Sequence, residues 1–221
     1  MIRKVLIAED HESANISVQK TLELLQVRSI DHVYYCDDAL AKIEFAKQAG
    51  ESYDLLISDL FFEQDYRAQK ISGGAALIAA ARAVQPELKI LIFSAENKPA
   101  VIDSLFRNYE IDGFVRKARN DAAELQVAFE KIAGNQRHYP KQLAEYAKHQ
   151  NAHNFTDFDV TIISLLAQGV PQKNIPEYLQ QHNIKPSGLS SVEKRFNQIR
   201  SVFEFSNNEQ LVAFCKDMGI I

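Results

Sequence analysis

The 221-residue sequence has no tryptophan and only two cysteines, Cys36 and Cys215. These cysteines lie far apart and have neither a CxxC spacing nor a Cys/His spacing suited to zinc, which argues against a disulfide scaffold and a structural zinc site. No apolar run is long enough to span a membrane, and the first residues lack the pattern of a secretory signal peptide. We therefore expect a soluble protein in a reducing cytoplasm.

An excess of charge of either sign is also lacking. The chain has 25 Lys and Arg against 29 Asp and Glu, which gives a net charge of −4. This balance argues against a protein that coats nucleic acid non-specifically, although it leaves room for a local basic face. An apolar content of 46% over this length allows one large domain, or a medium domain and a small one. We expect two domains.

Short apolar runs alternate with helical patterns along residues 1–133. A nearly continuous apolar run is typical of a parallel strand covered on both faces, and the amphipathic segment after it is typical of a crossover helix. We expect strands at residues 5–8, 29–35, 53–58, 88–93 and 113–117, and helices at 13–25, 39–49, 74–86, 99–107 and 121–133. Asp37 and Asp38 are expected to cap the second helix. The pattern predicts an α/β fold with a five-stranded, doubly wound parallel sheet.

Polar residues stand where these strands end, namely Glu9, Asp10, Asp59, Ser94 and Lys117. The carboxyl ends of parallel strands share one edge, so these side chains should converge there. Clustered carboxylates call for a cation, and Mg²⁺ binds carboxylates while bridging to phosphate oxygens. Taken singly, Asp59 has an alternative as a turn residue, Ser94 as a helix cap and Lys117 as a solvated surface lysine, and the nearby Phe114 has one as a core residue. The whole set favours phosphoryl transfer to a carboxylate, giving an aspartyl-phosphate.

With these residues, segment 1–133 resembles the receiver domain of bacterial two-component response regulators, a flavodoxin-like fold. The resemblance implies Asp59 as the phospho-acceptor, Lys117 as the phosphate-pairing lysine and Mg²⁺ as the cofactor. The metal ligands that it implies are Glu9, Asp10, Asp59 and the backbone carbonyl of Phe61. The switch residues that it implies are Ser94 and Phe114, the latter an aromatic ring that turns inward when the serine is drawn to the phosphoryl group.

The sequence departs from that family after the acceptor strand. The family usually continues through a short loop that contains proline and glycine, whereas the polar residues 63–72 intervene here before Gly73. Inserted polar loops are tolerated at low energetic cost. We expect this loop to alter the lifetime of the phosphoryl group or to meet a particular partner.

Residues 134–154 are predicted to be a linker that contains a short helix at 141–149, because the composition turns polar after Gly134. His138, His149 and His153 have no acid or cysteine spaced to complete a metal site. A solvated linker is favoured over a histidine metal site.

Residues 155–221 predict four short helices with tight turns. Thr156 is expected to cap a helix that Gly169 ends, Pro171 to begin the second helix, and the last two helices to cover residues 189–203 and 207–217. This spacing indicates a smaller all-α helix-turn-helix domain whose third helix faces a DNA groove.

The run LLAQGVPQKNI at residues 165–175 resembles the LuxR/NarL-type output domain of response regulators. This resemblance implies DNA contacts from the third helix, by Lys194, Arg195, Asn197, Gln198 and Arg200. Glu193 departs from the basic residue usual in that family, and segment 155–221 holds seven acidic and six basic residues. Because phosphate contacts dominate DNA affinity, we expect tight binding to need a homodimer.

We therefore expect a response-regulator transcription factor rather than an enzyme, phosphorylated on Asp59 by a sensor histidine kinase to control dimerisation and binding of promoter DNA. One alternative is a phosphorylation-regulated signalling adaptor whose helical domain binds protein, favoured by Glu193. Another is a metal-dependent phosphatase or other α/β enzyme, which fits the acids and the lysine but leaves the helical half without a role.

Overall fold

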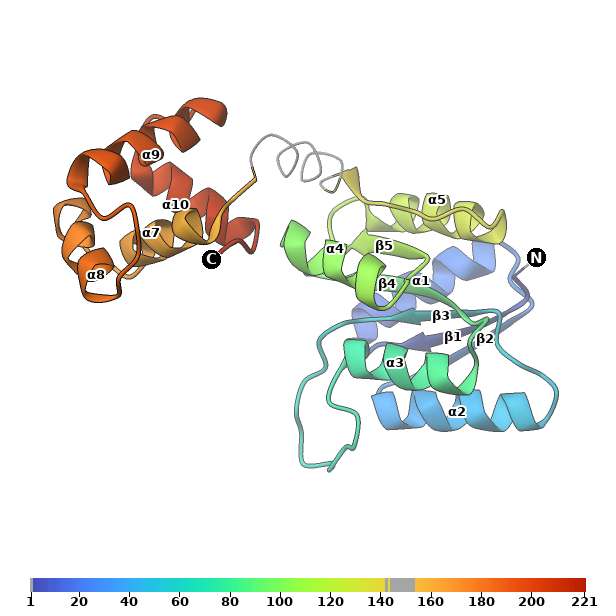
Figure 1. The fold of residues 1–221 in the computed structure, drawn as a ribbon. Coiled ribbons are helices and arrows are strands. Elements are labelled where there is room, and N and C mark those ends of the chain that lie inside the picture. Colours follow the sequence, from blue (N-terminus) through green and yellow to red (C-terminus); the bar gives the residue numbers. More distant parts are fainter. Residues whose placement is uncertain (1, 142, 144–153) are drawn as a thin grey trace. The chain divides into compact units, whose positions relative to one another are not determined.

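The computed structural model describes residues 2–141, 143 and 154–221 (Figure 1). Most of the predicted linker helix lies outside the described residues, and so do His149 and His153. The chain forms two compact units, one made mainly of residues up to Pro140 and the other mainly of residues 154–221. Among the described residues no helix has the length and apolarity needed to cross a membrane.

The first unit is built on five parallel strands in the order β2-β1-β3-β4-β5. Their bounds are β1 Lys4–Ala8, β2 Ser29–Val33, β3 Leu55–Ser58, β4 Lys89–Ser94 and β5 Gly113–Arg116. The helices between and after them are α1 Glu12–Leu24, α2 Cys36–Gln48, α3 Gly74–Val84, α4 Pro99–Asn108 and α5 Asp121–Ala133. The predicted doubly wound α/β fold is confirmed.

Helices cover the sheet on both faces, which explains why its central strands are apolar throughout. Figure 1 shows α1 and α5 on one face of the sheet and α2 and α3 on the other. On the α1/α5 face, Ile7 and Ile57 from the strands pack with Leu22 of α1 and Phe129 of α5. Burying strands on both faces fixes their carboxyl ends at one edge, and this positions the polar residues that follow them.

The start of α2 differs from the sequence prediction. The helix begins at Cys36 after an N-cap residue, Tyr35, that makes no side-chain cap hydrogen bond. The prediction that Asp37 and Asp38 cap the helix is therefore wrong, because both lie inside its first turn and their carboxylates bind the loop that follows β3. Their charge still suits the positive end of the helix dipole.

The second unit is helical, with α7 Asp157–Ala167, a 3-10 turn η1 Gln172–Asn174, α8 Ile175–Gln181, α9 Leu189–Val202 and α10 Asn208–Asp217. Thr156 caps α7 as predicted, in a reciprocal capping box with Asp159. Pro171 does not begin the second helix, because its backbone is extended and the 3-10 turn separates it from α8. Ile163, Leu179, Val192, Phe196 and Leu211 form the core of this unit.

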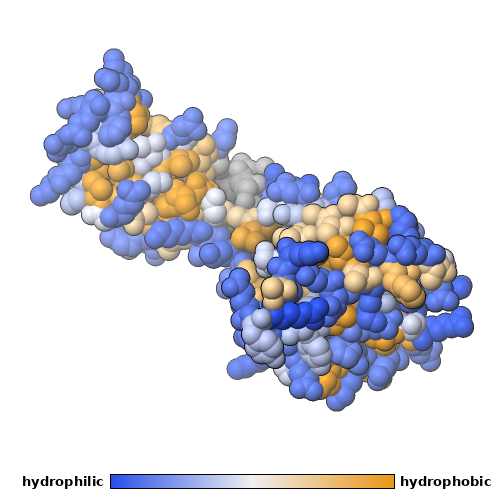
Figure 2. All heavy atoms as spheres, turned by 90° about the horizontal axis from the view of Figure 1, so that it is seen from below, coloured by the Kyte–Doolittle hydropathy of each residue, from blue (hydrophilic) through white to orange (hydrophobic). Residues whose placement is uncertain are grey.

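Exposed apolar side chains are spread over the surface. Leu24, Phe45 and Val127 in the first unit and Val202 in the second are among them. Figure 2 shows hydrophobic residues interspersed among hydrophilic ones on the face that it presents. Apolar residues scattered in this way are ordinary for a globular protein and do not identify a site by themselves.

Candidate functional site

Three carboxylates meet at the carboxyl edge of the sheet. Ala8 of β1 pairs with Ser58 of β3, so the residues that follow, Glu9 and Asp59, leave adjacent strands at the same level. Oxygens of Glu9, Asp10 and Asp59 and a ring nitrogen of His11 all lie within 4.8 Å of one another. Residues that are up to 50 positions apart in the chain are thus brought into one cluster.

Lys117 closes this cluster from the other side. It directly follows β5, and its backbone N–H donates to the carbonyl of Ser94 at 2.8 Å. Its ammonium nitrogen lies 2.6 Å from Asp59 Oδ2 and 2.7 Å from Glu9 Oε2. Lys117 thus contacts two of the three carboxylates, and the third, Asp10, lies against His11 instead.

Burial and pairing act on these groups in opposite directions. Burial raises the pKa of Glu9, whose side chain is only 2% exposed, while the hydrogen bond from Lys117 offsets part of this rise. Burial also works to lower the pKa of Lys117, but its hydrogen bonds to Asp59 and Glu9 outweigh burial and leave that pKa raised. The lysine is therefore a fixed positive charge at neutral pH.

The two oxygens of Asp59 have different surroundings. Oδ1 accepts the N–H groups of Leu60 at 2.6 Å and Phe61 at 3.4 Å, whereas Oδ2 accepts only the Lys117 ammonium among the hydrogen bonds of the described residues. Behind this carboxylate, a Cβ added to Gly74 would lie 2.0 Å from the Asp59 carbonyl oxygen. Glycine at this position lets α3 pack close against the acceptor strand and fixes how Asp59 is presented.

Ser94 is the last residue of β4, and its carbonyl accepts the backbone N–H of Lys117. Ser94 is fully buried, and within the described part of the chain its Oγ has no hydrogen-bond partner. A buried hydroxyl without a partner costs free energy unless a ligand satisfies it. Phe114, the other predicted switch residue, is also fully buried.

The start of the inserted loop reaches a pocket at this edge of the sheet. The pocket, about 440 Å³ in volume, is lined by Asp59 and Lys117, by His11, Ser13 and Ala14 after β1, by Ala95 after β4, and by Phe61, Phe62 and Glu63 after β3. The Glu63 N–H donates to Asp10 Oδ2 at 2.6 Å, and His11 Nδ1 lies 2.9 Å from Asp10 Oδ1. Both oxygens of Asp10 are therefore engaged by the chain itself.

The donor set fits a hard divalent cation. Glu9, Asp10 and Asp59 supply carboxylate oxygens, which Mg²⁺ prefers, and their charge exceeds what Lys117 neutralises. Phe61 lies beside Asp59, with its side chain 58% exposed. The role of its carbonyl as a ligand stays a prediction.

In the second unit, α9 presents a polar face. Glu193, Lys194, Asn197 and Gln198 are exposed, while Val192, Phe196 and Ile199 are buried. An open depression along this face is lined by Ser190, Glu193, Lys194, Asn197, Gln198, Ser201 and Val202. Arg200 is partly buried and its guanidinium donates to Asn197 Oδ1.

Arg195 is engaged inside the second unit. Its guanidinium donates to both oxygens of Asp159, with Nε 2.5 Å from Oδ1 and a terminal nitrogen 2.7 Å from Oδ2. Asp159 is fully buried and also accepts the backbone N–H of Thr156 at 2.9 Å. Burial opposes ionisation of Asp159, yet the bonds from Arg195 and Thr156 leave its pKa lowered. This bidentate pair fastens α9 to the start of α7.

His138 is not solvated, contrary to the expectation for the predicted linker. It is 5% exposed, its carbonyl accepts the N–H of Phe114, and its Nε2 lies 3.4 Å from Glu124. An isolated bridge to Gly113 extends the sheet edge at this point, which explains the burial. Among the described residues, the one group spaced to hold a metal does not include it.

No protein-family model matches the sequence, and no curated protein matches it. Solved structures do match. The RcsB response regulator of Salmonella typhimurium shares 18% identity over 97% of this chain and 98% of its own, with a TM-score of 0.61. A complex of the two-component response regulator RcsB with DNA shares 17% identity over 98% of this chain and 99% of its own, with a TM-score of 0.63.

The isolated receiver domain of RcsB from Salmonella enterica serovar Typhimurium, with the phosphomimetic BeF₃⁻, matches 66% of this chain and 98% of its own at 22% identity and a TM-score of 0.53. The chain has the two-domain fold of a response regulator. The resemblance found in the sequence is confirmed for the fold. What a chain with the response-regulator fold does must be argued from its own residues.

Two features of the sites escaped sequence reasoning. One is the Asp159–Arg195 pair, and its signal was present: Arg195 follows buried Val192 by three residues and precedes buried Phe196, which places it at the border of the buried stripe. The other is the engagement of Asp37 and Asp38 by the inserted loop. Their partners lie about 30 positions away in sequence, and no local pattern identifies them.

Proposed function

We propose that this chain is a response regulator whose Asp59 accepts a phosphoryl group from a sensor histidine kinase. The observation that supports this best is the carboxyl edge of the sheet, where Asp59 pairs with Lys117 and clusters with two further carboxylates, and where β4 ends at the buried Ser94. A cation site, a fixed positive charge and a hydroxyl donor are the groups that phosphoryl transfer to a carboxylate requires.

Each group has a role in the transfer that we propose. Oδ1 of Asp59 is held by the Leu60 N–H, so Oδ2 is the oxygen that attacks phosphorus while the phosphorus–nitrogen bond to the donor histidine breaks. Lys117 then follows onto a phosphoryl oxygen, and the Ser94 hydroxyl donates to another. Mg²⁺ held by Glu9, Asp10 and Asp59 would neutralise phosphoryl charge.

The response to phosphorylation starts, in this proposal, at Ser94. Among the described residues its hydroxyl has no hydrogen-bond partner, and the phosphoryl group would supply one, so the two states differ in free energy at this residue. Phe114 is already buried in the arrangement that the receiver resemblance associates with phosphorylation. We therefore assign the change to Ser94 and the segment that follows it, rather than to an inward turn of Phe114.

The output is DNA binding by the helical unit, assigned to residues 155–221 and joined by the linker 134–154 to the receiver domain 1–133. Lys194, Asn197 and Gln198 on the exposed face of α9 are placed to meet phosphates and base edges. Arg200 supports Asn197, and Arg195 holds the helix in place. Because this unit is nearly neutral, one copy makes few phosphate contacts, and this favours a homodimer on promoter DNA. We place the protein in the cytoplasm.

A second candidate function is an adaptor whose helical unit binds protein. Glu193 favours it, because this carboxylate lies in the middle of the exposed α9 face, where a phosphate backbone would repel it. A gel shift on promoter fragments that falls with salt and weakens in Lys194→Ala counts for DNA and against this adaptor.

The acceptor assignment is tested by incubating the full chain with acetyl phosphate and Mg²⁺ and measuring intact mass. Wild type should gain one phosphoryl group, labile to hydroxylamine, while Asp59→Asn and Asp10→Asn should gain little. Asp54→Asn is a matched control, because this nearby aspartate binds the backbone of Arg3 and Lys4 instead. Equal labelling of wild type and Asp59→Asn would overturn the assignment.

A further inference from the structure

Hydrogen bonds to the rest of the receiver unit hold the inserted loop near both of its ends. We call the loop together with Phe62, residues 62–72, the strap. At its near end the Glu63 N–H donates to Asp10 Oδ2, and at its far end the N–H groups of Lys70 and Ile71 both donate to the Asp37 carboxylate at 2.9 Å. A polar insertion with so many specific anchors is an ordered element rather than a loose loop.

The strongest anchor lies in the middle of the strap. Arg67 donates from both terminal nitrogens to the two oxygens of Asp38, and its guanidinium lies 4.2 Å from the centre of the Tyr35 ring. Tyr35 Oη donates to Asp65 Oδ2 at 2.7 Å. A bidentate pair stacked on an aromatic ring fixes an arginine in both position and plane.

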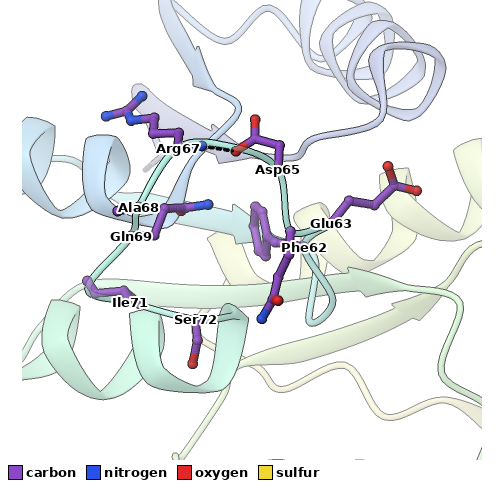
Figure 3. A pocket seen from close by; sticks show the side chains of 9 residues that line it. Phe62, Glu63, Asp65, Arg67, Ala68, Gln69, Ile71 and Ser72 are labelled. Carbon is purple, nitrogen blue, oxygen red and sulfur yellow. Dashed lines mark hydrogen bonds between the residues drawn. The ribbon is translucent and has the colours of Figure 1, made fainter.

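The strap also holds its own shape. Figure 3 shows it curving around a small hollow, with the hydrogen bond from the Arg67 N–H to Asp65 drawn as a dashed line. The hollow has a volume of about 220 Å³ and is lined by strap residues alone. Three residues separate Arg67 from Glu63, and the Arg67–Asp65 hydrogen bond folds this short segment, so we expect a shift of Arg67 to move Glu63.

Glu63 lies against one of the carboxylates that would hold the cation. A carboxylate oxygen that accepts a charge-assisted bond at 2.6 Å from a backbone N–H must give up or share that bond when a cation coordinates it. We propose that the Arg67–Asp38 clamp on α2 sets the affinity of the acidic cluster for a divalent cation, by holding the Glu63 N–H on Asp10. This inference takes one thing from the proposed function, namely that the acidic cluster is the cation site.

Two consequences follow from this competition. Releasing the clamp should tighten cation binding, because the cation no longer has to displace the strap from Asp10. Loading the cation should loosen the strap in the intact protein, by the reciprocity of linked equilibria. Arg67 and Asp38 are positioning residues in this scheme, since neither belongs to the acidic cluster.

The test is the dissociation constant of Mg²⁺ for the full chain, measured by isothermal titration calorimetry in wild type, Arg67→Ala and Asp38→Asn. Both variants should bind Mg²⁺ about five times more tightly, a change that corresponds to the net contribution of one typical hydrogen bond. Lys70→Ala is the matched control for the loss of one positive charge from the strap, because Lys70 contributes its backbone N–H to Asp37 and the substitution keeps it. Its affinity for Mg²⁺ should rise far less than that of Arg67→Ala.

The two variants separate the strap from simple electrostatics. Arg67→Ala removes a positive charge near the site and Asp38→Asn removes a negative one, so a pure charge effect tightens cation binding in the first and weakens it in the second. The clamp predicts tightening in both. Opposite changes, or no change in either, overturn the inference.

Chymotrypsin supplies a second readout at Tyr66, whose side chain is fully exposed on the strap. Cleavage needs the strap to open locally. Mg²⁺ should speed cleavage at Tyr66 in wild type, and Arg67→Ala should be cleaved faster than wild type without Mg²⁺. Slower cleavage with Mg²⁺ contradicts the competition.

The failure of this inference is distinct from failure of the proposed function. If wild type binds no Mg²⁺, or Asp10→Asn binds it as well as wild type, the cation site itself is wrong. If Asp10→Asn loses binding while Arg67→Ala and Asp38→Asn match wild type, only the strap inference is wrong.

Discussion

The acceptor edge of the sheet and the α7–α9 junction of the helical unit both contain a buried ion pair, but only one of them is complete. At the junction, Asp159 and Arg195 match in charge and their bond is bidentate. At the sheet edge, Lys117 faces more carboxylates than it can neutralise, and the Ser94 hydroxyl has no partner among the described residues. The balanced pair joins two helices, whereas the unbalanced cluster carries the charge that suits the cation and the phosphoryl group of the proposed function.

The largest effect that separates the two regions should come from Lys117→Met. Without the lysine, Glu9 and Asp59 become buried charges with no counter-ion, so the free energy of unfolding of the receiver unit should fall by about 3 kcal/mol. Addition of Mg²⁺ should restore much of this loss, since the cation binds the folded state. Chemical denaturation with and without Mg²⁺ measures both changes. A loss that Mg²⁺ leaves untouched would contradict the view of this edge as a cation site.

Breaking the balanced pair should have a comparable or smaller effect that no ion repairs. Asp159→Ala leaves Arg195 without its partner and should destabilise the helical unit by about 2–3 kcal/mol, with or without Mg²⁺. The double variant Asp159→Leu/Arg195→Met should recover much of this stability, because it removes both charges. A double variant as unstable as the sum of its parts would show that packing, rather than the pair, matters at this junction.

The salt dependence of DNA binding distinguishes the roles of neighbouring residues on α9. Lys194 is exposed and should contribute a phosphate contact, so Lys194→Ala should lower the slope of log K against log salt by about 1. Arg195→Lys keeps the charge but loses the bidentate geometry, and it should weaken binding with an unchanged slope. Fluorescence anisotropy over a salt series measures both. If the slope of log K against log salt falls equally in the two variants, Arg195 contacts a phosphate.

The smallest of these effects is expected in the dependence of stability on acidic pH. The bonds from Arg195 and Thr156 outweigh burial and hold the pKa of Asp159 below its ordinary value of 3.8. A depressed folded-state pKa contributes stability that is fully present above about pH 4 and is lost as pH falls through the lower folded value. Unfolding of the helical unit followed from pH 5 to pH 2 should show this loss in wild type and not in Asp159→Asn. An equally steep decline in the variant would assign the acid sensitivity to other groups.

The sequence predicted the first of these regions well and the second only in part. Glu9, Asp59 and Lys117 could be placed because each ends an apolar strand, and parallel strands have one carboxyl edge. The Arg195–Asp159 pair and the Arg67–Asp38 clamp join residues 36 and 29 positions apart, on elements whose packing no local period determines. Pattern reveals which face of an element is buried, but not which polar groups meet across the interface.

Capture of a phosphoryl group by Asp59, Lys117 and Ser94 is the step on which the proposed function depends most, and a phosphoryl analogue tests it directly. The measurement is the melting temperature of the full chain with Mg²⁺ and BeF₃⁻ together, compared with each alone, in wild type and in Asp59→Asn. Wild type should be stabilised only when both are present, because the analogue needs the cation as well as the acceptor carboxylate. Equal stabilisation of Asp59→Asn, or none in wild type, would contradict the account.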